Sequence, residues 1–248
     1  MKLLVNILYK IYQIIIAFPV LVIWTIFTAL EVGLGTTLGN GHYWGYVPGR
    51  WWGKVILRAF LIPVTVEGRQ NLEKNQSYVF VANHQGAFDI FSIYGFLDHD
   101  FKWMMRKGLA NIPLVGYACR VAGHIMVDKS SPEALKQTMD TAKERLQGGK
   151  SLVVFPEGRR TPDGKMHEFK NGAYRLAVDF KLPVVPITID GSYKVMPRTT
   201  VNITPGKIIL TLHEPIIPGD EGHDLSKLVK ESRDAILSSL PESEDSEK

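Results

Sequence analysis

The sequence predicts an α/β domain with a mixed, largely parallel sheet flanked by helices, preceded by an N-terminal apolar two-helix motif that attaches to a membrane. Two observations carry this prediction. Residues 11–49 contain a single charged residue, Glu31, although charged residues make up 22% of the 248-residue chain. From Thr65 onward, short apolar runs alternate with helical patterns, which is typical of α/β domains. We therefore expect a membrane-associated segment (1–64), a folded body (65–240) and an acidic disordered tail (241–248).

The N-terminal segment contains two apolar stretches. Residues 11–30 form 20 consecutive positions without a charge, which is long enough to cross about 30 Å of hydrocarbon. The second stretch, 51–64, carries Lys54 and Arg58 on one helical face. Three interpretations of the first stretch remain open: a spanning helix, a helix broken at Pro19 or at a turn over 33–35, and a buried core helix. The positive charges on either side do not decide its topology.

The body is predicted to contain strands and helices in alternation. The expected strands cover 77–83, 102–107, 124–129, 151–156, 182–189 and 208–212. Ser131 is a candidate N-cap for a helix over 131–149, with Pro132 in its first turn and two glycines at its end. A terminal amphipathic helix is expected over 224–240.

Composition excludes several classes of protein. Cys119 is the single cysteine, so no disulfide framework and no cysteine-built metal site is possible, and we expect it to be a small core side chain. The histidines outside the candidate site show no spacing typical of metal ligands. The net charge of +4 suits anionic lipids, and no nucleic-acid recognition motif accompanies it, so we expect no nucleic-acid partner.

The first candidate site is NHQGAFD, from Asn83 to Asp89. His84 follows an apolar strand, and Asp89 lies five residues further on. An imidazole that acts as a base needs a partner on one nitrogen to set its tautomer, and a carboxylate one turn away provides this. We therefore interpret His84 as a general base oriented by Asp89, without a built-in nucleophile. The spacing alone also fits a loop histidine paired with a carboxylate for structural reasons.

The second candidate site is FPEGRRT, from Phe155 to Thr161, directly after the apolar run SLVV. Arginine can bind phosphate through two parallel hydrogen bonds, and Gly158 allows the backbone to approach a ligand closely. This pattern favours recognition of a phosphorylated ligand, although a solvated surface turn fits the segment by itself.

These blocks together resemble the lysophosphatidic acid acyltransferase (1-acylglycerol-3-phosphate O-acyltransferase) family. NHQGAFD, MRKGLANIPLVG (105–116), GHIMVDK (123–129), FPEGRR and LPVVPI (182–187) follow in the order of the family's blocks. The resemblance covers about residues 65–190. The chain departs from the usual pattern at Arg106, Gly108, Lys129 and Arg159, all in blocks on the acceptor side, so these departures bear on which acceptor is used.

The resemblance implies an activity and roles for the site residues. His84 would deprotonate a lysophospholipid hydroxyl, which would then attack an acyl-CoA or acyl carrier protein thioester, giving phosphatidic acid. It assigns acceptor binding to Glu157, Gly158, Arg160, Lys129 and Arg106. Backbone N–H groups near Gly86, or a nearby cation, would stabilise the oxyanion.

The resemblance also implies that no cofactor and no metal takes part. The expected partners are the membrane bilayer, the lysophospholipid acceptor and the acyl donor. The catalytic domain is expected on the cytoplasmic side of the inner membrane, because the donor is supplied there. Glycerol 3-phosphate, another lysophospholipid or an acylated amino-acid lipid remain alternative acceptors, and a non-catalytic lipid-binding protein is a more distant alternative. Acyl-chain length and oligomeric state are left open.

Overall fold

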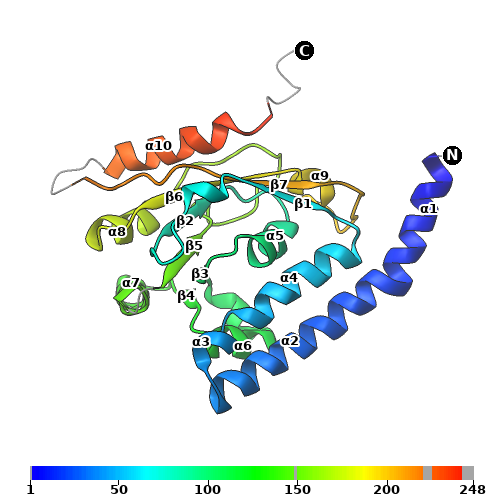
Figure 1. Cartoon of the computed structure of the whole chain (residues 1–248), viewed down its shortest axis with the longest axis horizontal. Helices are drawn as coiled ribbons and strands as arrows, with labels where there is room; N and C mark the ends of the chain where they lie inside the picture. Colours follow the sequence, from blue (N-terminus) through cyan, green and yellow to red (C-terminus); the bar gives the residue numbers. More distant parts are fainter. Residues whose placement is uncertain (1, 148–149, 220–224, 242–248) are drawn as a thin grey trace.

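The computed structural model describes residues 2–147, 150–219 and 225–241 and places a seven-stranded sheet at the centre of the molecule (Figure 1). The strand order is β1-β7-β6-β2-β5-β3-β4. The five strands from β6 to β4 run parallel to one another, whereas β7 is antiparallel to β6 and β1 is parallel to β7. The strands are β1 (Val64–Glu67), β2 (Val79–Ala82), β3 (Phe101–Arg106), β4 (Ile125–Val127), β5 (Ser151–Val154), β6 (Val184–Asp190) and β7 (Ile208–Leu212).

The expected mixed, largely parallel sheet is therefore confirmed, and all six predicted strands are present, five with shifted ends and β7 with the predicted bounds. The sequence reading missed β1, which lies at the edge of the sheet. Its four residues alternate between half-buried and exposed. The run is too short to be recognised as a strand separate from the apolar stretch that precedes it.

Helices cover both faces of the sheet. Along β2, Val79 and Val81 pack with α8 and α10, whereas Phe80 and Ala82 pack on the side of α4 and α5, because successive side chains of a strand point to opposite faces. Both faces are buried, as in other parallel sheets. The helices of the body are α5 (Phe88–Phe96), α6 (Val115–Val121), α7 (Pro132–Gln147), α8 (Gly172–Asp179), α9 (Ser192–Val195) and α10 (Leu225–Ser238).

Two helix predictions in the body are confirmed with small shifts. The Ser131 hydroxyl accepts a hydrogen bond from the Ala134 N–H (3.1 Å), as expected for an N-cap, and α7 begins at Pro132. The terminal amphipathic helix is α10. The predicted disordered tail falls on residues 241–248, of which 242–248 lie outside the described part of the chain.

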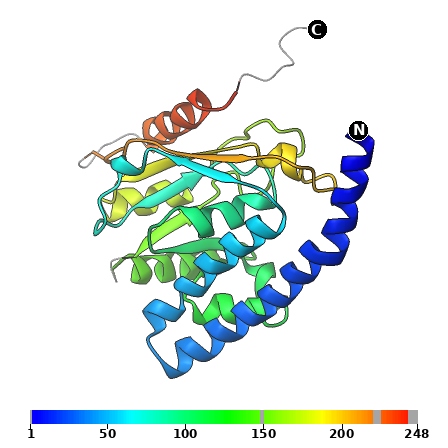
Figure 2. The same ribbon diagram turned by 45° about the vertical axis from the view of Figure 1, so that its right-hand side comes forward.

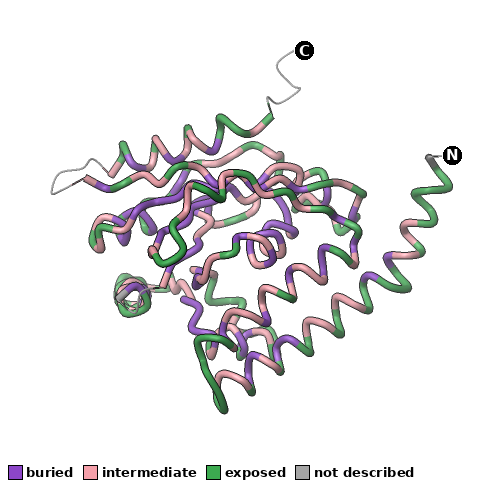
Figure 3. The backbone as a smooth tube through the Cα atoms, viewed as in Figure 1, coloured by how far each residue is buried: buried purple, intermediate pink, exposed green. Residues whose placement is uncertain are grey.

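The N-terminal segment begins with one long helix at the border of the molecule (Figure 2). It consists of α1 (Lys2–Tyr12), a π-helical turn η1 (Gln13–Ala17) and α2 (Phe18–Leu38). The helix over residues 3–38 is long and apolar enough to cross a membrane, and many of its large apolar residues are exposed (Figure 3). This helix is consistent with membrane association. The break considered at 33–35 is absent, because α2 continues through it and ends at Gly39.

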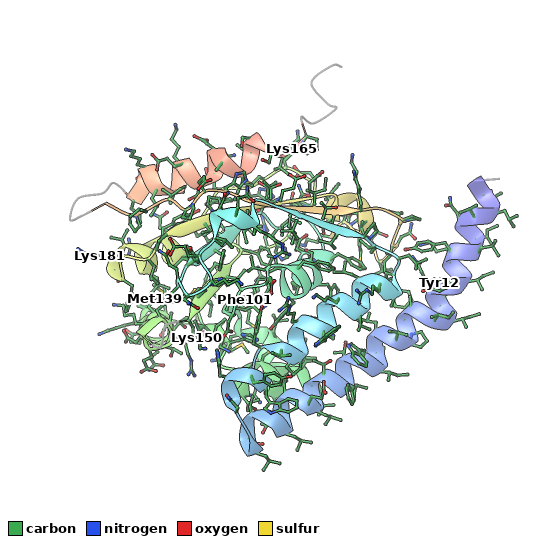
Figure 4. The ribbon with its side chains drawn as sticks, in the orientation of Figure 1. Tyr12, Phe101, Met139, Lys150, Lys165 and Lys181 are labelled. Atoms are coloured by element: carbon green, nitrogen blue, oxygen red, sulfur yellow. The ribbon has the colours of Figure 1, made fainter. Side chains whose placement is uncertain are left out.

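The π-helical turn lies where this helix is fixed to the body. The Tyr9 and Tyr12 hydroxyls donate to the carbonyls of Phe60 (2.7 Å) and Ala59 (2.9 Å) at the end of α4, so they satisfy carbonyls that a helix end leaves unpaired. Gln13 is buried and donates to the Ile203 carbonyl (3.0 Å). Tyr12 is labelled on this helix in Figure 4.

After the short helix α3 (Gly41–Trp44), the second apolar stretch forms α4 (Val47–Ala59) and the start of β1. The α4 helix crosses α5 so closely that Gly53 faces Gly95, and Ile56 and Leu57 are buried in the main core. Trp52 also donates to the Thr25 hydroxyl of α2 (2.9 Å). The second helix of the predicted membrane-attaching motif is thus packed against the body on one side and against α2 on the other.

We expect Gly53→Ala to lower the free energy of unfolding by about 1–3 kcal/mol, a typical cost of overpacking. A Cβ at this position would lie 2.7 Å from the Gly95 backbone nitrogen and closer still to the Phe91 carbonyl oxygen, and neither atom can move without shifting α5. Urea unfolding of the full chain in detergent measures the change. Gly172→Ala is the control, because no described atom outside its chain neighbours and its own helix backbone lies within 4 Å of its Cβ position; equal stability of the two variants would contradict the prediction.

Candidate active site

The predicted site residues follow four neighbouring parallel strands. In the order β2-β5-β3-β4, the carboxyl ends of all four strands lie at the same edge of the sheet. His84 follows β2, the FPEGRR block follows β5, Arg106 ends β3, and Lys129 comes two residues after β4. Residues far apart in the sequence therefore meet at this edge, as they do at the ligand sites of other α/β sheets.

His84, in the loop after β2, forms a hydrogen-bonded pair with Asp89, in the first turn of α5. His84 Nδ1 lies 2.7 Å from Asp89 Oδ2, and the Asp89 side chain is fully buried. The same oxygen accepts the backbone N–H groups of Gln85 (2.7 Å) and Gly86 (2.9 Å). This carboxylate also accepts a hydrogen bond from the Nδ1–H of His84, which favours the tautomer in which Nε2 is free to accept a proton.

The backbone bonds to Asp89 correct one expectation. The N–H groups of Gln85 and Gly86 are committed to the Asp89 carboxylate, so these two groups do not stabilise an oxyanion. A cation near His84, or another backbone N–H group of this loop, stays the expected source.

The block after β5 contacts both the ring and the backbone of His84. The Phe155 ring stacks on the His84 imidazole, with centroids 3.9 Å apart and planes 8° apart. Glu157 is buried, and its carboxylate accepts the backbone N–H of His84 (2.7 Å) and of His167 (2.9 Å). Burial raises the pKa of Glu157, and these two hydrogen bonds act against that rise. Glu157 thus joins the loops around His84.

His84 lines a cavity of about 1340 Å³ between the sheet edge and the N-terminal helices. Its inner walls are mostly apolar, and they come from α2, α5 and α6 as well as from the strand ends. Leu135 and Met139 of α7, the latter labelled in Figure 4, extend this apolar lining.

The mouth of the cavity is cationic. Seven lysine and arginine residues line the cavity, and all of them except the half-buried Arg160 are exposed, so they lie on its solvent side: Arg106, Lys107, Lys129, Arg159, Arg160, Lys170 and Arg198. Partial desolvation, with the like charges of Lys170 and Arg106, lowers the pKa of Lys129. Lys107 is paired with Asp128 (2.6 Å), and the Arg106 Nε donates to the Gly158 carbonyl (3.2 Å). An apolar interior behind a cationic mouth fits a lipid with an anionic headgroup.

Comparison with known proteins identifies the family. A family model described as Acyltransferase matches residues 63–190, just over half of the chain. The chain belongs to the acyltransferase family. The matched range begins just before β1 and ends with β6, so it includes every strand end of the candidate site.

Curated relatives of this acyltransferase carry the name 1-acyl-sn-glycerol-3-phosphate acyltransferase, as the sequence blocks suggest. The Chlamydomonas reinhardtii protein is 32% identical over 180 residues, covering 72% of this chain and 53% of its own length. The Saccharomyces cerevisiae protein is 29% identical over 214 residues, covering 84% of this chain and 70% of its own. The chain spans about half the length of the algal and chloroplast relatives it matches.

A solved structure extends the similarity to the N-terminal helices. The crystal structure of the 1-acyl-sn-glycerophosphate (LPA) acyltransferase PlsC from Thermotoga maritima matches with a TM-score of 0.78 and 28% identity. The match covers 96% of this chain and 97% of that one. The predicted fold and the predicted resemblance are both confirmed by these matches.

Within this acyltransferase, the predicted site residues lie in two layers. Five of them line the cavity: His84, Arg106, Lys129, Gly158 and Arg160. Asp89 and Glu157 are buried behind the cavity wall. The resemblance implies that Glu157 binds substrate, whereas both of its oxygens accept backbone N–H groups, so the geometry favours a positioning role. Gly158 has φ of +74°, a conformation that favours glycine.

Sequence reasoning missed other residues of the site. Phe155 lies within a quoted block, but nothing in the sequence indicates that its ring stacks on His84. Lys170 belongs to a polar loop that follows FPEGRR. Arg198 lies outside all the blocks, and no sequence signal identifies it. Cys119 lines the cavity as a half-buried side chain, and burial raises the pKa of its thiol to about 11, so it is not a thiolate nucleophile.

The inner wall contains a buried histidine, His124, that is neutral at physiological pH. Its Nδ1 accepts the Trp103 backbone N–H (3.2 Å), so its Nε2 carries the proton and faces the Tyr94 hydroxyl (2.6 Å). Burial, with a smaller contribution from the charge of Lys102, lowers the pKa of His124 to about 3. Protonation of Nδ1 would also remove the bond from Trp103.

We expect this histidine to destabilise the fold in acid. Between pH 6.5 and about 3 the unfolded chain binds a proton at His124 that the folded chain does not, so stability falls as pH decreases. His124→Gln should therefore have a shallower pH dependence of unfolding free energy between pH 6 and 4, by about 1.4 kcal/mol per pH unit. Parallel curves for the two proteins, measured by urea unfolding, would refute this.

Proposed function

We propose that this chain transfers a fatty acyl group from an acyl thioester to the free hydroxyl of 1-acylglycerol 3-phosphate, which gives phosphatidic acid. The observation that carries the proposal is the His84–Asp89 pair, with Nδ1 and Oδ2 2.7 Å apart, at a cavity that is apolar inside and cationic at its mouth. The names of the relatives support the same acceptor. Simple lipid binding would not require an oriented base.

In the proposed mechanism, His84 Nε2 takes the proton of the acceptor hydroxyl as the oxygen attacks the thioester carbon. The resulting imidazolium is stabilised by the Asp89 carboxylate, which is fully buried and held by two backbone N–H groups. The tetrahedral intermediate then breaks its carbon–sulfur bond, and His84 returns the proton to the departing thiolate. No acyl-enzyme forms, and no metal or cofactor is required.

The cations at the mouth would bind the acceptor phosphate. Lys129, Arg106 and Arg160 line the same cavity as His84, and in 1-acylglycerol 3-phosphate the phosphate is only a few bonds from the free hydroxyl. A guanidinium can donate two parallel hydrogen bonds to a phosphate, whereas the ammonium of Lys129 acts as a point charge. The apolar inner walls would accommodate acyl chains.

We further propose that the N-terminal helix lies in the inner membrane and that the cavity opens toward the cytoplasm. The exposed apolar side chains of α1 and α2 would contact lipid, and Lys54 of α4 would remain near the headgroups. This arrangement would place the cavity, which Thr25 and Val32 of α2 help to line, beside the bilayer that contains the acceptor.

A direct assay tests the proposed function. The purified chain in lipid–detergent micelles is given one isotope-labelled acyl group, carried either by CoA or by acyl carrier protein. The acceptors are 1-acylglycerol 3-phosphate, glycerol 3-phosphate, a lysophospholipid with a larger headgroup and an acylated amino acid. Mass spectrometry of the products should find labelled phosphatidic acid as the main product. Transfer to a different acceptor would refute the acceptor assignment, and no transfer at all would refute the enzyme assignment.

A further inference from the structure

A second hollow of about 440 Å³ adjoins the catalytic cavity. Its lining residues are Arg160, Met196, Arg198, Thr199, Thr200 and Val201. Arg160 and Arg198 also line the catalytic cavity, so the two spaces meet at these two residues. The hollow therefore combines two cations and two hydroxyl-bearing side chains beside the path to His84.

Arg198 is held in register with the catalytic loop. Gly86, between His84 and Asp89, forms an antiparallel bridge with Pro197, the residue before Arg198. The contact is close, because a Cβ on Gly86 would lie 2.6 Å from the Ser192 carbonyl oxygen and 3.0 Å from that of Met196. The backbone before Arg198 is thus fixed to the loop that carries the base.

The two arginines are also coupled to each other. Arg198 Nη1 donates to the Arg160 carbonyl (3.4 Å), which joins the segment after α9 to the block after β5. In the described part of the chain, Arg50 and Arg69 share Asp98, whereas neither Arg160 nor Arg198 has a carboxylate partner. Two cationic side chains that line the same junction without a carboxylate partner create a site for an anion.

We propose that Arg198, together with Arg160, binds the phosphate group of a substrate where the two spaces meet. This inference rests on the proposed function, and it adds a residue that lies outside all the sequence blocks. Two substrates of that reaction carry phosphate: the acceptor, close to its reacting hydroxyl, and the carrier of the acyl donor, far from its thioester. The chemistry required of Arg198 is the same in both cases.

Steady-state kinetics of Arg198→Ala and Arg198→Lys test the assignment and distinguish the two sources. We expect the alanine variant to raise the KM for 1-acylglycerol 3-phosphate by about tenfold or more with kcat within threefold, and lysine to restore part of the loss. A rise confined to the KM for acyl-CoA would also support the proposal and would identify the donor's phosphate. Unchanged KM values for both substrates would overturn it.

Two controls make the result specific to phosphate. Arg233→Ala removes an arginine of α10, a helix that lines neither space, and it should leave both KM values unchanged. A 1-monoacylglycerol acceptor has the same hydroxyl without phosphate, so wild type and Arg198→Ala should use it equally well if the phosphate is the acceptor's. An equal loss of activity with both acceptors would mean that Arg198 supports the fold or binds the donor. A raised KM for the donor would indicate donor binding, and an unchanged one would indicate a role in the fold.

A binding measurement separates this inference from the proposed function. Glycerol 3-phosphate should raise the thermal unfolding midpoint of the full chain in detergent, and glycerol should not. The rise should be lost in Arg198→Ala and kept in Arg233→Ala. This result would stand even if no acyl transfer were detected. CoA is tested in the same way, because the carrier of the donor also has phosphate; rises with glycerol 3-phosphate and with CoA that are both equal in wild type and Arg198→Ala would overturn the inference.

Discussion

Replacement of His84 by alanine is expected to reduce acyl transfer by about 10³-fold or more, because it removes the base that accepts the hydroxyl proton. The protein should remain folded. The imidazole contributes a stack on Phe155 and one bond to Asp89, and it is 13% exposed at the cavity wall, so its loss leaves no large void in the core. Turnover is measured with saturating acceptor and donor, and folding by circular dichroism and the thermal midpoint.

His213 provides the matched control. It follows β7, which runs antiparallel to β6 and its parallel neighbours, so it lies at the opposite edge of the sheet from His84. His213→Ala should keep activity within about threefold of wild type once folded protein is compared, although it loses a bond to the Thr188 hydroxyl (2.8 Å). A folded His84→Ala protein with more than a tenth of wild-type turnover would show that His84 is not the base.

The sequence predicted the sheet well where its strands are buried on both faces. Runs such as SLVVFP and LPVVPITI consist almost entirely of apolar residues, and they become β5 and β6 in the middle of the sheet. Periodicity within one segment cannot show which strands are neighbours, however. The order β2-β5-β3-β4, which brings His84, Arg160, Arg106 and Lys129 together, follows from packing between segments that are distant in the sequence.

The same limit explains what the sequence could not show about the site. Glu157 can be recognised as part of a polar block, but its bonds to the backbone of residues 84 and 167 depend on how three loops meet. Arg198 is placed by the bridge between Gly86 and Pro197, and no local pattern encodes that contact. The amphipathic pattern of α4 also fits two structures. An apolar helix face that packs on α5 has the same composition as a face that contacts lipid, so the sequence cannot distinguish them.

Asp89→Asn is expected to lower kcat by about 10³-fold while the KM values for acceptor and donor change little. Asp89 is fully buried and does not line the cavity, so it acts on substrates only through His84. The asparagine oxygen can still accept the bonds from Gln85 and Gly86, and the loop should keep its shape. What is lost is the negative charge that stabilises the imidazolium as the proton moves.

A double substitution tests whether Asp89 acts only through His84. If Asp89 contributes only by orienting and stabilising His84, the variant with both His84→Ala and Asp89→Asn should be no slower than His84→Ala alone. Losses that multiply would mean that Asp89 has a separate role. Asp98→Asn is the matched control, since Asp98 is an exposed carboxylate with φ of +58°, a conformation that asparagine tolerates. Asp98→Asn should retain wild-type kcat. The loss in Asp89→Asn would then come from removing a negative charge next to His84, and not from removing a carboxylate elsewhere.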